Sequence, residues 1–248
     1  MALKTISDQS TLKKKLSCNN CEDSNCFIKK HIAKEWHALI DKKKFQTTYN
    51  RGQNIINAGA PVLGLYFIIK GKVKVISIGF TGKPQIVRFS KDGHVLEHRG
   101  LGSDTYSISA IAMDDTQVCF IDNATLHNIF MNNPEFTYAM LLYYSDELRK
   151  VEERLKIIAQ MTIREKIAYS LVLLYNNFGV NYLNMLDVHF TREDLASVAG
   201  TSNEQVVRQL TEFEEEGLIH KHGRKIIIDN INKLKNIISP LNPNSILE

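Results

Sequence analysis

The pattern of apolar and polar positions changes along the chain and divides it into two regions. From Phe45 to about Asp122, short apolar runs alternate with glycines. Many short strands separated by turns at this spacing predict a small antiparallel barrel or roll. After Pro134 no glycine occurs before Gly179, and the apolar positions recur at helical spacing. The sequence therefore predicts an α+β fold, with an N-terminal antiparallel β-roll followed by helices.

Particular strands can be predicted within the roll. The runs Leu65–Ile69 and Val73–Ile76 flank Gly71, which predicts two strands joined by a tight turn. A second turn at Phe80–Pro84 leads into a predicted strand at Gln85–Phe89. Strands that follow one another through short turns in this way predict a β-meander.

The helical region contains a narrow apolar seam flanked by charged residues. Its members step by four and three positions, which is typical of helices paired in a coiled coil. They are Tyr144, Leu148, Val151, Leu155 and Ile158. A helix lying on its own domain would show a similar stripe, but the narrowness of the seam favours pairing between two chains. We therefore expect a homodimer, and a second helix at Ile163–Phe178 that ends at Gly179.

Two short helices with a glycine between them are predicted near the C-terminus. Thr191 can cap the first helix, Gly200 ends it, and the second begins from Thr201 or Ser202. Such a pair forms a helix-turn-helix, whose second helix enters the major groove of DNA. The exposed beginning of this second helix carries Ser202, Asn203, Glu204, Val207 and Arg208.

Glu204 and Arg208 are the candidates for reading bases. They lie one helical turn apart and point to the same side. An arginine can hydrogen-bond guanine in two places, and a glutamate can accept from cytosine. The alternative interpretation is an ordinary ion pair on the surface of an amphipathic helix.

A basic β-hairpin is predicted directly after the second helix. Its strands, Leu218–Lys221 and Lys225–Ile228, lie on either side of Gly223. Its basic residues are Lys221, His222, Arg224 and Lys225. A wing of this kind would lie close to DNA phosphates. Helix, turn, helix and basic wing in this order favour DNA binding over the ion-pair interpretation.

These features resemble the Crp/Fnr family of bacterial regulators, from about Phe45 to the end of the chain. The resemblance is carried by Gly52, Gly59, the stretch Leu65–Val75, the long helix, and Thr191–Arg208 with its wing. It implies a roll of the cyclic-nucleotide-binding type, a long dimerisation helix and a winged helix-turn-helix. It also implies double-stranded promoter DNA and RNA polymerase as partners.

The resemblance assigns roles to single residues of the second helix. The base-reading pair of the family falls on Glu204 and Arg208. Contacts to the DNA backbone near the start of the helix match Thr201, Ser202 and Gln205. Where Crp has a further arginine this chain has Asn203, so we expect a different operator preference.

The expected ligand pocket differs from the pocket of those family members that bind cyclic AMP. Those proteins hold the phosphate with a Gly-Glu and a following Arg-Ser pair. The corresponding stretches here are Leu96–Leu101 and Tyr106–Ala110, and the second contains no arginine. An unneutralised phosphate in a semi-buried site costs several kcal/mol, so we do not expect cyclic AMP binding. Arg99 could serve an anion from a shifted position, but a surface salt bridge is the favoured interpretation.

Four cysteines are the second group of candidate functional residues: Cys18, Cys21, Cys26 and Cys119. In a reducing compartment they are thiols or metal ligands, and four thiolates suit an iron–sulfur cluster or zinc. Fnr-type regulators bind a [4Fe–4S] cluster with three N-terminal cysteines and a fourth in the roll, and only the last N-terminal gap differs here, by one residue. Alternatively, Cys119 is a buried core thiol and the other three belong to an N-terminal arm.

Composition and charge limit the classes of protein to which the chain can belong. A chain of 248 residues with 44% hydrophobic and 23% charged residues can form two folded domains. The net charge of +4 is too small to indicate nucleic acid by itself. No apolar run approaches the roughly 20 residues that span a membrane, and the N-terminus lacks a secretory signal. We therefore expect a cytoplasmic protein with no membrane partner.

Two other functions would each use part of this sequence. A small redox or metal-dependent enzyme would use the cysteines with His31, His94, His98 or His127. No catalytic motif accompanies these residues, so we expect no enzyme. A cyclic-nucleotide-binding module that controls a partner would not explain the winged helix.

The expected organisation has four parts. They are a Cys-containing segment at 1–30, a sensor domain at 31–133, a dimerisation helix at 134–162 and a winged helix-turn-helix domain at 163–248. A short helix around Ile32–Ile40 opens the sensor domain, because its apolar residues share one face. The effector, the operator and the direction of regulation are not specified by the sequence.

Overall fold

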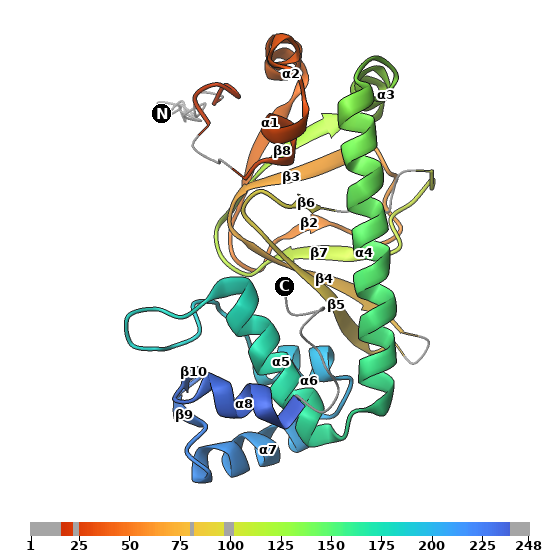
Figure 1. Ribbon diagram of the computed structural model, residues 1–248. Coiled ribbons are helices and arrows are strands. Elements are labelled where there is room, and N and C mark those ends of the chain that lie inside the picture. The colour runs from red at the N-terminus through yellow and green to blue at the C-terminus, as the bar shows by residue number, and fades with distance from the viewer. Residues whose placement is uncertain (1–15, 22–24, 80–81, 97–101, 239–248) are drawn as a thin grey trace, which may run out of the picture.

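The structure is a computed structural model that describes residues 16–21, 25–79, 82–96 and 102–238. A β-roll forms one part of the molecule and a helical domain the other, with a long helix running beside both (Figure 1). This mixed architecture confirms the predicted fold class. The helices are α1 (Phe27–His31), η1 (Lys34–Trp36), α2 (His37–Lys43), α3 (Asn123–Asn132), α4 (Pro134–Gln160), α5 (Ile163–Phe178), α6 (Arg192–Ala199), α7 (Asn203–Glu215) and α8 (Ile231–Ile238).

The described part of the roll consists of two antiparallel sheets of four strands each. The first has the order β1 (Phe45–Tyr49), β8 (Thr116–Asp122), β3 (Gly64–Lys70) and β6 (Val95–Leu96). The second has the order β2 (Asn54–Ile56), β7 (Ser109–Ala112), β4 (Lys72–Ile78) and β5 (Pro84–Lys91). Between them lies an apolar core that includes Val73, Ala110 and Val118. Burying each valine side chain contributes about 1.5–3 kcal/mol.

The predicted meander through Gly71 is wrong. The strands on either side of this glycine, β3 and β4, lie in different sheets, so Gly71 marks the point where the chain crosses between them. The hairpin partner of β4 is instead β5. Two strands on either side of a glycine have the same apolar sequence pattern whether they pair with each other or lie in different sheets. In both arrangements one face of each strand is buried. In the turn after β4, Phe80 and Thr81 lie outside the described residues, and Gly82 N–H donates to Gly79 O at 2.9 Å.

Gly71→Ala is expected to destabilise the roll. The backbone at Gly71 has φ +134°, and an added Cβ would lie 2.3 Å from Thr116 Oγ1. Strain and overlap together should lower the free energy of unfolding by about 1–3 kcal/mol or more. Gly82→Ala is the matched control, because Gly82 also has positive φ but no atom within 4 Å of an added Cβ. Urea unfolding of both variants measures the difference, and equal losses would refute the close approach at Thr116.

The N-terminal part of the sensor domain differs from the single helix predicted at Ile32–Ile40. The described chain forms α1, the short η1 and α2, and Ile32 between α1 and η1 has an extended backbone. Ile32 and Ile40 are both buried in the same core. The apolar spacing therefore indicated the buried face correctly but not the break between the helices.

The C-terminal domain follows a sharp turn after α4. Thr162 caps α5 with a capping box, in which its hydroxyl accepts from Glu165 N–H and the Glu165 carboxylate accepts from Thr162 N–H. Helix α5 ends at Gly179, as predicted. The domain continues through α6 and α7 to the hairpin of β9 (Ile219–His222) and β10 (Lys225–Ile228), and then to α8. None of the described helices is both long and apolar enough to cross a membrane.

The roll and the C-terminal domain share one apolar core. Ile86 and Phe89 of β5 belong to the same buried cluster as the interior of the C-terminal domain. Polar contacts also join the two, since Ser197 of α6 donates to Pro84 O at 2.9 Å and accepts from Ile86 N–H at 2.8 Å. An ion pair links Lys74 of β4 to Asp194 of α6. A change in the roll can therefore reach α6 through direct contacts.

Candidate DNA-binding surface and cysteine cavity

Local hydrogen bonds and one glycine define where α6 and α7 begin and where α6 ends. The hydroxyl of Thr191 accepts from Asp194 N–H at 3.0 Å, and the Asp194 carboxylate accepts from Thr191 N–H at 2.9 Å. Gly200 ends α6 in the left-handed conformation, with φ +62° and ψ +42°. Ser202 then caps α7 by accepting from Gln205 N–H at 3.3 Å. The predicted cap, turn and start of the second helix are confirmed.

Helix α7 presents one buried and one exposed face. Val206, Leu210 and Phe213 are buried, as predicted, and anchor the helix on α5 and α6. The exposed residues near its beginning are Asn203, Glu204, Val207 and Arg208. Helix α7 lies at the end of the molecule opposite α2, with no other element outside it (Figure 1). Its exposed face is therefore accessible to a long partner such as duplex DNA.

Glu204 and Arg208 do not form the surface ion pair that was the alternative interpretation. Among the described residues, the carboxylate that faces Arg208 is Glu212, with Arg208 Nε 3.9 Å from Glu212 Oε1. A hydrogen bond with the Ser202 side chain lowers the pKa of Glu204. Glu204 is therefore ionised at neutral pH and able to accept hydrogen bonds.

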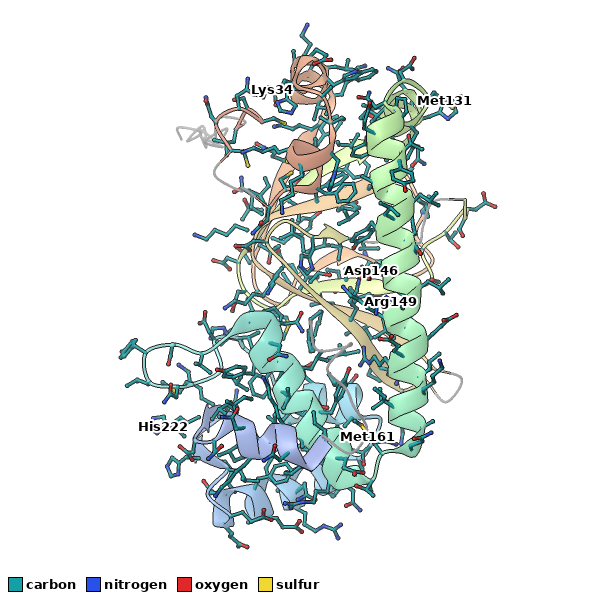
Figure 2. The ribbon with its side chains drawn as sticks, viewed as in Figure 1. Lys34, Met131, Asp146, Arg149, Met161 and His222 are labelled. Atoms are coloured by element: carbon teal, nitrogen blue, oxygen red, sulfur yellow. The ribbon has the colours of Figure 1, made fainter. Side chains whose placement is uncertain are left out.

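The basic side chains of the wing differ from one another in their contacts. Strands β9 and β10 pair around Gly223, which has φ +61°. Lys221 Nζ lies 2.8 Å from Glu214 Oε2 and 3.1 Å from Thr211 Oγ1, so Lys221 is held against α7. Arg224 and Lys225 are exposed. His222 lies beside them at the edge of the domain (Figure 2).

The start of α7 and the wing lie on the same side of the domain. Asn203 and Arg224 line one surface cavity of about 350 Å³, together with Thr191 and Arg192 at the start of α6. Of the sequence-predicted residues, Asn203 of the helix and Arg224 of the wing are thus brought to one surface. Three segments of chain contribute to it.

The four cysteines also come together, although they are distant in sequence. Cys18, Cys21, Cys26 and Cys119 line one cavity between the N-terminal segment and the first sheet. Cys18 and Cys119 are buried, and Cys21 and Cys26 are half-buried. The cavity has a volume of about 20 Å³, which is room for about one water molecule. Among the described residues, no three side chains are already arranged as metal ligands.

Two basic residues that the sequence analysis missed line the same cavity. They are Lys29 and Lys44. Lys44 is only 2% exposed, and its Nζ lies 2.8 Å from Asp41 Oδ1 and 3.3 Å from Cys18 Sγ. Burial raises the pKa of Cys18 to about 12, so Cys18 is a thiol at neutral pH without a bound metal. A buried lysine at the end of a short helix has no signature in sequence that separates it from a surface lysine.

The stretch Tyr106–Ala110 corresponds to the phosphate-binding pair of the members that bind cyclic AMP. It contributes side chains to the apolar interior of the roll. Tyr106, Ile108 and Ala110 are buried there, and the Tyr106 hydroxyl donates to Gly64 O at 3.0 Å. Residues Glu97–Leu101, including Arg99, lie outside the described residues.

The apolar seam of α4 is divided by the structure. Leu148 and Leu155 are 61% and 67% exposed, as a surface for pairing requires. Tyr144, Val151 and Ile158 are half-buried against their own chain. Three leucines at intervals of seven form the exposed stripe instead: Leu141, Leu148 and Leu155. Leu141 was not predicted, although its position one heptad before Leu148 indicates the stripe.

Comparison with known proteins identifies two domains in the chain. Residues 46–133 match the cyclic nucleotide-binding domain, and residues 165–237 match the Crp-like helix-turn-helix domain. Helix α4 occupies most of the interval between the two matches. The order of the two domains agrees with the order of roll and helix-turn-helix described above.

Curated and solved proteins support the same arrangement. The transcriptional activator protein anr of Pseudomonas aeruginosa is 26% identical over 184 residues, which cover 73% of this chain and 75% of the relative. The fumarate and nitrate reduction regulatory protein of Escherichia coli is 24% identical over 221 residues, 87% of each chain. The structure of FixK2 from Bradyrhizobium japonicum has a TM-score of 0.67 at 22% identity, covers 78% of this chain and 96% of that one, and supports the fold.

Proposed function

The chain belongs to the Crp/Fnr family of transcription regulators, and we propose that it binds promoter DNA as a homodimer through α7 and the wing. The observation that carries this proposal is the shared surface of Asn203 and Arg224, which joins the beginning of α7 to the wing. The relatives found are transcription regulators, which favours this function over the enzyme alternative.

We assign proposed roles to residues of α7, of the turn before it and of the wing. Arg208 donates two hydrogen bonds to a guanine, and Glu204 accepts one from a cytosine. Arg224 and Lys225 contact phosphates, which hold the protein in register without reading sequence. Lys221 would join them only after leaving Glu214. Further contacts to the DNA backbone come from Thr201, Ser202 and Gln205.

We propose that dimerisation uses the exposed stripe of α4. Two copies of α4 that pair through Leu141, Leu148 and Leu155 bury apolar surface that is otherwise in water. A twofold pair would carry two copies of α7 on one face of DNA, with half-sites about 34 Å apart.

Negative charges introduced into the exposed stripe of α4 should prevent the two chains from pairing. We expect the double change Leu148→Glu and Leu155→Glu to give a monomer, because four like charges would face one another across the pair. Lys156→Glu is the control, since Lys156 is exposed beside Leu155 but outside the stripe. Light scattering should report half the wild-type mass for the double variant alone, and circular dichroism checks that it is folded. A dimer of unchanged affinity would place the interface elsewhere.

We propose that the four cysteines hold a [4Fe–4S] cluster, with zinc as the second candidate. In support, the donor set is four sulfurs around one cavity, and the buried ammonium of Lys44 can offset part of the negative charge of four thiolates. Metal binding would displace the proton of Cys18, and the small cavity requires the half-buried Cys21 and Cys26 to shift outward. When bound, such a cluster supplies sensitivity to oxidants.

The remaining partners follow from the same family. We propose RNA polymerase as the protein partner on the promoter and the cytoplasm as the compartment, where the thiols stay reduced. Cyclic AMP is not proposed as the effector, because the stretch Tyr106–Ala110 contains no arginine to neutralise its phosphate.

A further inference from the structure

Two side chains beside the cysteine cavity donate hydrogen bonds to cysteine sulfurs. Lys44 Nζ lies 3.3 Å from Cys18 Sγ, and Gln46 Nε2 lies 3.4 Å from Cys119 Sγ. Lys44 and Gln46 are two residues apart on extended backbone at the start of β1, where alternate side chains point to the same side. One short segment therefore contacts a sulfur of the N-terminal segment and a sulfur of β8.

The ammonium of Lys44 is held in place from two sides. Asp41 Oδ1 lies 2.8 Å from Lys44 Nζ and also accepts from the backbone N–H of Cys18 at 2.8 Å. The Cys18 sulfur is the second group that faces the ammonium. A buried charge is costly unless negative charge and hydrogen bonds compensate it. Additional negative charge on the sulfurs would therefore be stabilised here.

The amide of Gln46 is fixed at both ends. Its Oε1 accepts from Leu16 N–H at 2.7 Å, and its Nε2 donates to Leu16 O at 3.0 Å as well as to Cys119 Sγ. These bonds tie the segment that precedes Cys18 to β8. They also set which end of the amide faces the sulfur, since the oxygen is engaged with the backbone.

We propose that Lys44 and Gln46 are positioning residues that raise the reduction potential of a cluster held by the four cysteines. This inference rests on the cluster proposed above. Reduction adds one electron to a cluster that is already negatively charged by its thiolates. Positive charge and N–H donors at the sulfurs stabilise the reduced state more than the oxidised state. The charged Lys44 should act more strongly than the neutral Gln46.

The test compares variants of the full-length protein purified without oxygen. The measurements are iron and sulfide per chain and the midpoint potential from spectroelectrochemical titration. We expect Lys44→Met to shift the midpoint to a more negative potential, and Gln46→Leu to shift it less in the same direction. Lys44→Arg keeps charge and donors and should stay near the wild type. Lys43→Met is the control, because Lys43 is an exposed neighbour.

The outcomes separate this inference from the proposal of the cluster. Wild-type protein without iron and sulfide would overturn both. Wild-type protein with a cluster, and the same midpoint in Lys44→Met and Gln46→Leu, would overturn the inference alone. If Lys44→Met cannot hold the cluster while Lys44→Arg can, at equal melting temperature, the positioning role is supported. In that case, the midpoint potential of the cluster in Gln46→Leu, compared with the wild type, tests the effect on the reduction potential.

Discussion

Cys119→Ser is expected to abolish the bound cluster as completely as Cys21→Ser does. The two residues lie far apart in sequence but line one cavity. In the proposed cluster each would supply one of four ligands, and a serine oxygen replaces soft thiolate poorly. Anaerobically purified wild-type protein should be brown, whereas both variants should be colourless and lack iron and sulfide.

A control on the same strand separates ligation from folding. Val118 is fully buried in the interior of the roll, on the side opposite Cys119. Val118→Ala should lower stability but keep the colour. Loss of colour in Cys21→Ser alone would indicate a local N-terminal metal site. Colour in both cysteine variants would remove Cys21 and Cys119 as ligands.

Arg208→Ala should cost about 1–3 kcal/mol of binding free energy and relax the preference at one position in each half-site. Arg208 is exposed on α7 with only a long contact of 3.9 Å to Glu212, so it is available for a base. Lys225→Ala should weaken binding to all sequences evenly and flatten the salt dependence, because a phosphate contact carries little sequence information. Titrations against operator variants at two salt concentrations compare the two changes. Equal, sequence-independent losses would show that Arg208 contacts only the DNA backbone.

Local signals predicted the helix-turn-helix well. Thr191, Gly200 and Ser202 each act through bonds to residues a few positions away, and such bonds can be read from sequence. The buried face of α7 also followed from helical spacing. The roles of its exposed residues in DNA binding remain predictions, because burial and caps specify a helix and not its partner.

Features that depend on distant contacts were not predictable in the same way. Gly71 lies where the chain crosses between the two sheets, close to Thr116 on a strand far along the chain. Lys44 is buried because Asp41 and Cys18 meet it, and a lysine in a polar segment gives no sign of this. The half-burial of Tyr144 depends on how α4 lies on the roll, so the seam could be predicted as apolar but not divided into its inner and outer faces.

In the proposed complex, two copies of α7 that are joined through α4 read DNA together. The most direct measurement is the affinity of the protein for a selected operator and for the same operator with about 5 base pairs inserted between its half-sites. Half a helical turn of DNA moves the second half-site to the opposite face. We predict that the insertion reduces binding to that of a single half-site. Insertion of a full turn should do the same, because it adds roughly another 34 Å between the half-sites that α4 holds one turn apart. Equal affinity for all three DNAs would contradict the account.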